Sequence, residues 1–240
     1  MSRIYDAMRR GALADASHRT LVFSASDEAR PADPVAEGFE RVLKAIQGRQ
    51  GSKTGGVILV VSAVHGEGAS TVARELALLL ARDGLARPVL VDANLRTPMQ
   101  HRAFGVERTS GLTELVTQGL ALDQAVRNGA GSLLPLLTSG RAAGNPTAVL
   151  GAPALRAAVE ALRAKYDWVV VDGAPVTVYG DASILAGWVD GVVIVVAAER
   201  TRSEVVAQAK RIIEEAGGRI LGAVLNRQRH HIPQAAYELL

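Results

Sequence analysis

Apolar residues occur along this chain in short continuous runs, and turn-forming segments separate one run from the next. These runs predict strands over residues 57–62, 88–92, 168–172, 191–197 and 219–225. Between them, apolar residues recur every three to four positions, which predicts helices over 71–83, 153–165 and 203–216. Strands that are apolar at successive positions are typical of a parallel sheet that is covered on both faces. The sequence therefore predicts an α/β fold with a doubly wound, mostly parallel sheet and helices on both faces.

The first part of the chain has a different pattern. A short helix is predicted within residues 4–13, and a polar connector follows it. Apolar residues return at helical spacing within 35–46 and predict an amphipathic helix. Residues 47–56 are rich in Gly, Ser and Gln and predict a linker into the first strand. We therefore divide the chain into an N-terminal arm and connector over 1–34 and a main domain over 35–240.

The composition limits the classes of function. With 240 residues, of which 48% are hydrophobic, the chain can bury one substantial core. The 27 basic and 24 acidic residues leave a net charge of only +3, and the few aromatic residues are scattered, so binding to nucleic acid is not expected. The lack of cysteine excludes disulfides and cysteine-based metal sites. No apolar run reaches the length of about 18 residues that a membrane span needs, so we expect a cytoplasmic protein.

A glycine-rich loop follows the first predicted strand. Gly66 and Gly68 can adopt left-handed backbone conformations, so that successive N–H groups converge on phosphate oxygens. A helix that begins at Ser70 or Thr71 would add its positive end, and the Ser70 hydroxyl stands where a P-loop holds Mg²⁺. Taken alone, the loop could also be an ordinary strand-to-helix turn. The candidate nucleotide-binding residues here are Gly66, Glu67, Gly68, Ala69, Ser70 and Thr71.

Ala69 stands where the P-loop pattern has a lysine. That lysine places a positive charge on the terminal phosphates, and losing one charge-assisted contact costs about 1.5–3 kcal/mol. This corresponds to a roughly 10- to 150-fold loss of affinity. The lysines of the chain lie outside the loop, at Lys44, Lys53, Lys165 and Lys210. We therefore expect weak or absent nucleotide binding, with ATP or ADP and Mg²⁺ as cofactors if binding is retained.

Polar residues stand at the carboxyl ends of three predicted strands. Asp92 and Asp172 end two of them, while Asn226 and Arg227 follow the last one. Such ends line one edge of a parallel sheet, where ligands bind in this type of fold. One carboxylate alone would more simply be a helix cap or a turn. Two of them beside a phosphate-type loop favour Mg²⁺, which prefers oxygen ligands, and the predicted ligands are Ser70, Asp92 and Asp172.

These motifs resemble, in order and spacing, the cytoplasmic domain of the bacterial tyrosine kinases (BY-kinases) of capsule and exopolysaccharide systems. The resemblance covers roughly residues 35–227 and implies the P-loop NTPase fold of the wider Min/Par-type ATPases. The Walker A, Walker A′ and Walker B segments of the family match residues 62–71, 89–98 and 168–176. The resemblance implies that Asp92 and Asp172 are the catalytic, metal-holding carboxylates. It also implies that Asn226 reads the adenine edge, and Asn226 and Arg227 complete the candidate nucleotide-binding residues.

Three departures from the family pattern predict impaired catalysis. Ala69 replaces the Walker A lysine, Asn94 replaces a Walker A′ aspartate and cannot act as a base, and the tyrosine-rich tail is reduced to Tyr237. An engineered Ala69 is an alternative explanation, but Asn94 and the short tail favour natural divergence. Only Glu37 keeps the register of the helix motif through which the family builds rings. A family-type ring is therefore not expected, and self-association in another form stays open.

The resemblance and its departures together predict a regulatory or structural partner in exopolysaccharide chain-length control or export. Such a protein would be held at the inner face of the plasma membrane by a membrane polysaccharide co-polymerase. The alternative is an active ATP-dependent protein-tyrosine autokinase. A Min/Par-type positioning ATPase is less favoured, because Ser62 and Ala63 stand where that group has a lysine near the start of the loop.

Overall fold

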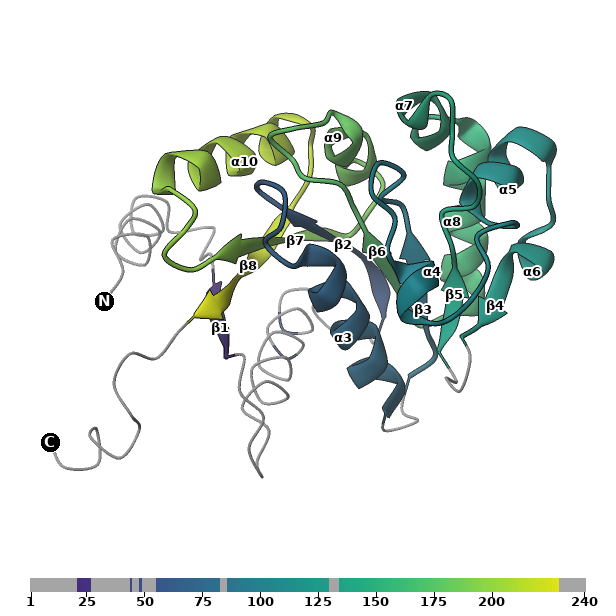
Figure 1. The fold of residues 1–240 in the computed structure, drawn as a ribbon, viewed down its shortest axis with the longest axis horizontal. Coiled ribbons are helices and arrows are strands. Elements are labelled where there is room, and N and C mark those ends of the chain that lie inside the picture. Colours follow the sequence, from purple (N-terminus) through teal and green to yellow (C-terminus); the bar gives the residue numbers. More distant parts are fainter. Residues whose placement is uncertain are drawn as a thin grey trace, which may run out of the picture.

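The computed structural model describes residues 21–26, 44, 48, 55–82, 86–129 and 134–228. In this part of the chain the strands form a single sheet in the order β1-β8-β7-β2-β6-β3-β5-β4 (Figure 1). Neighbouring strands run parallel, except that β4 and β5 pair antiparallel at one edge. The predicted doubly wound, mostly parallel α/β fold is therefore confirmed.

Strands and helices alternate over most of the described chain, except that three short helices and a strand pair lie within residues 100–137. The strands are β1 (Leu21–Ser26), β2 (Gly56–Ser62), β3 (Pro88–Asp92), β4 (Val126–Asn128), β5 (Pro135–Leu137), β6 (Trp168–Asp172), β7 (Gly191–Ala197) and β8 (Ile220–Gln228). The helices are α3 (Ala69–Arg82), α4 (Gln100–Ala103), α5 (Leu112–Gln118), α6 (Leu122–Ala125), α7 (Pro146–Leu150), α8 (Pro153–Lys165), α9 (Asp181–Ala186) and α10 (Ser203–Glu215). Within the described residues, no helix is long and apolar enough to cross a membrane.

The central strand β2 is buried on both faces of the sheet. Successive side chains of a strand point to opposite faces, and the apolar residues of β2 divide accordingly. Leu59 packs in the cluster that contains residues of α8, α9 and α10, whereas Ile58 packs in the cluster that contains residues of α3. Figure 1 shows α3 on one side of the sheet and α9 and α10 on the other. This two-sided burial explains why the sequence of β2 has no polar alternation.

The predicted elements agree closely with the structure, with a few corrections. The strands 88–92, 168–172 and 191–197 and the helix 153–165 begin and end as predicted. Helix α3 begins at Ala69 rather than at Ser70 or Thr71, and β8 extends through Gln228, so Asn226 and Arg227 lie within the strand. These differences arise because hydrogen bonding continues beyond the apolar positions that mark an element in sequence.

The sequence did not predict the strands β1, β4 and β5 or the short helices α4 to α7 and α9. Among these strands, β1 is the most distant from its partner in sequence. Residues 21–26 fall within the predicted polar connector, yet they pair in parallel with β8 at the edge of the sheet. The apolar run Leu-Val-Phe is only three residues long, so it gives a weak local signal, and pairing with β8 supplies the hydrogen bonds. The helix within 4–13, the helix motif with Glu37, and Tyr237 lie outside the described residues. The boundary at residue 34 stays a prediction.

Candidate nucleotide-binding site

The glycine-rich loop connects β2 to α3 at the carboxyl edge of the sheet. Gly66 and Gly68 have φ angles of 80° and 93°, in the left-handed region that favours glycine. A β-carbon at Gly68 would lie 2.3 Å from Asn226 Nδ2, so any larger residue would displace the Asn226 side chain. The loop therefore has the backbone form that the sequence predicted, and α3 begins directly after it.

Buried Glu67 ties this loop to the neighbouring strand β7. Its carboxylate accepts hydrogen bonds from Val64 N at 2.8 Å and from Ala197 N at 3.1 Å. The Thr201 hydroxyl donates a further hydrogen bond to the same carboxylate. Asn226 Nδ2 donates to the Glu67 carbonyl oxygen at 2.8 Å, which also connects the loop to β8. We call these five residues the loop clamp; it holds the loop in place without any contribution from a lysine.

The predicted metal ligands lie on the other side of β2. Asp92 and Asp172 are aligned as partners at the carboxyl ends of β3 and β6, and both are fully buried. Ser70 Oγ donates a hydrogen bond to Asp172 Oδ1 at 3.1 Å. Parallel pairing therefore brings Asp92 and Asp172 together, and Ser70 reaches Asp172 from the first turn of α3. Their role as Mg²⁺ ligands stays a prediction.

Gln100 is a site residue that the sequence analysis missed. Its side-chain amide donates to Asp172 Oδ2 at 2.7 Å and to the Ser70 carbonyl oxygen at 2.9 Å. Its backbone N–H donates to Asp92 Oδ2 at 3.1 Å. Gln100 is fully buried and bridges both carboxylates and the first turn of α3. A single glutamine eight positions after Asp92 has no motif around it, so only the folded structure reveals this role.

The two carboxylates have perturbed pKa values. Burial raises the pKa of Asp92 well above its ordinary range, and the nearby charge of Asp172 raises it further. Burial also raises the pKa of Asp172, to about 6, while the hydrogen bonds from Gln100 and Ser70 oppose this change. Asp92 Oδ1 is buried and has no hydrogen-bond partner among the described residues. An unpaired buried carboxylate oxygen is what a cation site requires, so these residues fit Mg²⁺.

Asn94 takes part in a local turn. Its Oδ1 accepts a hydrogen bond from Thr97 N at 3.1 Å, and its Nδ2 donates to Thr97 Oγ1 at 3.3 Å. Such side-chain bonds to a nearby backbone group stabilise turns. The amide at position 94 therefore shapes the segment after β3.

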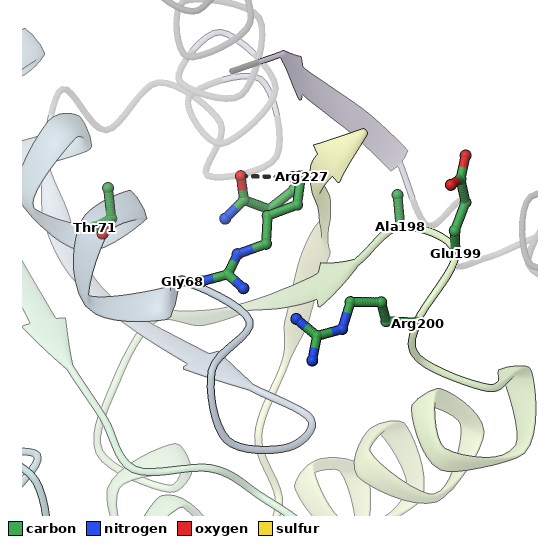
Figure 2. A pocket seen from close by; sticks show the side chains of 7 residues that line it. Gly68, Thr71, Ala198, Glu199, Arg200 and Arg227 are labelled. Atoms are coloured by element: carbon green, nitrogen blue, oxygen red, sulfur yellow. Dashed lines mark hydrogen bonds between the residues drawn. The ribbon is translucent and has the colours of Figure 1, made fainter. Parts of the chain in front are cut away.

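A pocket of about 690 Å³ opens between the loop and the ends of β7 and β8 (Figure 2). Its lining residues are Gly68, Thr71, Ala198, Glu199, Arg200, Asn226 and Arg227. Four of these were predicted as nucleotide-binding residues, whereas Arg200 was not. The Ala69 side chain packs away from this pocket, in the apolar cluster with Val72 and Ala73 of α3. The structure therefore places a cationic side chain at this site that no P-loop motif would identify.

Hydrogen bonds and a cation–π contact also connect the Walker A′ segment to the residues after β6. Arg96 donates to both carboxylate oxygens of Asp181, at 2.8 and 3.0 Å, and its guanidinium lies 4.7 Å from the ring centroid of Tyr179. The Tyr179 ring makes an edge contact with His65 of the glycine-rich loop, with centroids 5.5 Å apart. These contacts join the Walker A and Walker A′ segments to the residues that follow the Walker B segment.

Comparison with known proteins identifies the family. A family model described as ParA: NUBPL iron-transfer P-loop NTPase matches residues 53–239. The tyrosine-protein kinase YwqD of Bacillus subtilis is 35% identical over 172 residues, which cover 72% of each protein. The chain belongs to the bacterial tyrosine kinase family of P-loop NTPases. The tyrosine-protein kinase CpsD of Streptococcus agalactiae is 31% identical over 199 residues, covering 82% of this chain and 86% of CpsD.

Solved structures of this family have the same fold. The chimerical protein CapA2B2 superimposes with a TM-score of 0.81 at 26% identity, covering 90% of this chain and 97% of that one. The kinase domain of the Escherichia coli tyrosine kinase ETK has a TM-score of 0.80 at 23% identity, with coverage of 85% and 80%. The expected P-loop NTPase fold and the resemblance to bacterial tyrosine kinases are therefore confirmed.

Proposed function

We propose that this protein is a bacterial tyrosine kinase relative with impaired phosphoryl transfer that acts as a regulatory or structural partner in exopolysaccharide chain-length control or export. The proposal rests on one observation: the backbone and pocket of a nucleotide site are present, whereas two of its charged side chains are replaced. The loop, the strand-end carboxylates and the pocket are present, but Ala69 and Asn94 occupy the positions of a lysine and an aspartate.

The remaining residues can be assigned to separate tasks. With a nucleotide bound, the Ser70 hydroxyl, Asp92 and Asp172 would hold Mg²⁺, and the loop N–H groups would bind phosphate oxygens. The metal ion would neutralise charge on the phosphates. Asn94 cannot accept a proton from a tyrosine hydroxyl, and its oxygen already accepts a hydrogen bond from Thr97. In this assignment the site still binds and orients a nucleotide. Activation of the terminal phosphate and of the tyrosine hydroxyl is weakened, because the lysine and the aspartate are replaced by Ala69 and Asn94.

The direct test of impaired catalysis is incubation of the purified chain with labelled ATP and Mg²⁺, followed by detection of phosphotyrosine. We expect no detectable label. YwqD, assayed in parallel, serves as the control for the reaction conditions, since it carries the name of a tyrosine kinase. Robust labelling of any tyrosine of this chain would reject the proposal and favour the alternative, an active autokinase. That alternative is favoured by one observation, the intact pair of Asp92 and Asp172 with bridging Gln100.

The partner proposal has a separate test. A membrane polysaccharide co-polymerase should co-purify with the full chain, and deletion of residues 1–20 should reduce its recovery. The deletion stops at 20 because residues 21–26 form β1, which pairs with β8. Removal of the residues after Gln228 is the matched control and should leave recovery unchanged. Equal recovery after both deletions would reject the N-terminal arm as the docking element, and no recovery with the full chain would reject the partner role.

A further inference from the structure

Two arginine side chains enter the pocket beside the glycine-rich loop. Figure 2 shows the guanidinium of Arg227 next to Gly68 and that of Arg200 directed toward the loop from the end of β7. Glu199, the acidic residue of the lining, points its carboxylate away from both. Among the described residues, neither guanidinium has a hydrogen bond or an ion pair with another side chain. In the described part of the chain, two guanidinium groups without a side-chain partner therefore line a pocket together with residues of the glycine-rich loop and the start of α3.

The backbone at this pocket is strained. Glu199 and Arg227 have φ angles of 61° and 57°, and in the described part of the chain they are the only residues other than glycine with positive φ. A left-handed conformation is unfavourable at a residue other than glycine and tends to persist at functional sites. At Glu199 this conformation accompanies the outward carboxylate and the inward guanidinium of the next residue. The strained backbone at Glu199 and Arg227 therefore lies where it directs the two guanidinium groups into the pocket.

We propose that Arg200 and Arg227 provide the positive charge for nucleotide phosphates that Ala69 cannot provide. The inference deepens the proposed function and rests on it, because it names the groups that allow binding to continue without catalysis. A guanidinium keeps its charge at all physiological pH values, and its planar donors match two oxygens of one phosphate. The loop clamp keeps the backbone donors in place, so both kinds of contact are available to one ligand. The ligand class is a nucleoside diphosphate or triphosphate.

The position of the two arginines also predicts which phosphates they contact. They lie at the ends of β7 and β8, on the opposite side of β2 from the carboxylates at the ends of β3 and β6. The terminal phosphate of a triphosphate belongs near the metal ligands. Asn226, which the family resemblance assigns to adenine, lines the same pocket as the arginines, together with Thr71 of the first turn of α3. The arginines therefore act on the phosphates nearest the nucleoside, which ADP and ATP share. A lysine at position 69 would reach the terminal phosphates instead. The pocket should therefore discriminate little between the diphosphate and the triphosphate.

Calorimetric titration of the full chain with ADP and with ATP, each with Mg²⁺, tests this inference. We expect both nucleotides to bind, with dissociation constants within about threefold of each other, or roughly 0.7 kcal/mol. Arg200→Ala and Arg227→Ala should each weaken ADP binding by about tenfold. The matched control is Arg202→Ala, which removes an exposed arginine two positions away that does not line the pocket. Ala69→Lys combined with Arg200→Ala should recover ATP binding more than ADP binding.

The outcomes separate this inference from the proposed function. If the unaltered chain binds neither nucleotide, the arginine proposal is rejected, while a regulatory partner without catalysis still stands. If the chain binds nucleotide and both arginine variants bind as tightly, or Arg202→Ala weakens binding equally, the assignment of these two residues is also rejected. Thermal unfolding of each variant shows whether the fold is retained. Phosphotyrosine on the unaltered chain would reject the proposed function instead.

Discussion

The two sides of the candidate nucleotide site differ in their hydrogen bonds and in their charged side chains. On the side of β7 and β8, the loop clamp is fully hydrogen bonded and two arginines enter the pocket. On the side of β3 and β6, two buried carboxylates face each other with raised pKa values, and no lysine opposes their charge at Ala69. The side of β7 and β8, which we call the first side, is therefore organised to bind an anion. The side of β3 and β6, the second side, lacks the positive charge of the P-loop lysine. Binding and phosphoryl transfer therefore depend on different parts of one site.

The largest expected effect is on the affinity for Mg²⁺-ATP, when the missing charged side chains of the second side are restored. Ala69→Lys should raise the affinity for Mg²⁺-ATP by about 10- to 150-fold, the value of one charge-assisted contact. Turnover should require Asn94→Asp as well, because only a carboxylate can accept the proton. Calorimetry and phosphotyrosine detection on both single variants and the double variant measure these effects separately. Unchanged affinity in Ala69→Lys would show that the loop cannot direct a lysine to the phosphates, and His65 beside Tyr179 would be the next position to change.

A smaller effect is expected on the first side, from weakening the loop clamp. Glu67→Gln replaces one carboxylate oxygen with an NH₂ group that cannot accept a hydrogen bond. Either Val64 N, or both Ala197 N and Thr201 Oγ1, then lose their acceptor. A buried donor without a partner costs about 1–3 kcal/mol. Urea unfolding should report that loss, and nucleotide affinity should fall with it. The matched control is the exposed Glu215→Gln at the end of α10, which should change neither quantity.

The smallest expected effect concerns charge on the second side in the absence of metal. The folded-state pKa of Asp172 is raised to about 6, so the unfolded chain binds fewer protons than the folded chain between that value and the ordinary aspartate pKa. The free energy of unfolding contributed by this group therefore falls as pH rises through this window. Asp92→Asn, which removes the neighbouring charge, should raise the midpoint of thermal unfolding at pH 7 without Mg²⁺ by a few degrees, on the order of 1 kcal/mol.

Asp167 is the matched control for this comparison, because its perturbation has the opposite sign. Hydrogen bonds from Arg87 lower the pKa of Asp167, so its contribution is present above the ordinary aspartate pKa and is lost as pH falls. Asp167→Asn should therefore lower the unfolding midpoint slightly or leave it unchanged. A decrease in the midpoint for Asp92→Asn as well would show that the buried carboxylates stabilise the protein without metal.

Local sequence patterns were sufficient for most of the fold and for part of the site. The strands that end at Asp92 and Asp172 are continuously apolar because both sheet faces are covered, and this pattern is visible without any structure. The left-handed angles at Gly66 and Gly68 are accessible because glycine has no β-carbon, so the sequence could predict them. The short strand β1 was missed because its stability depends on pairing with β8, which lies about two hundred residues later in the chain.

The sequence by itself determined the fold class, the family and the residues at the strand ends, because these depend on side-chain type and on spacing within one element. Only the tertiary structure decided which groups meet. Gln100 reaches both carboxylates because parallel pairing aligns Asp92 with Asp172. Glu67 joins the loop to β7, and Arg200 enters the pocket from the end of that strand. These contacts join residues that are distant in sequence, so they depend on strand order and on backbone geometry at each strand end, which no local pattern specifies.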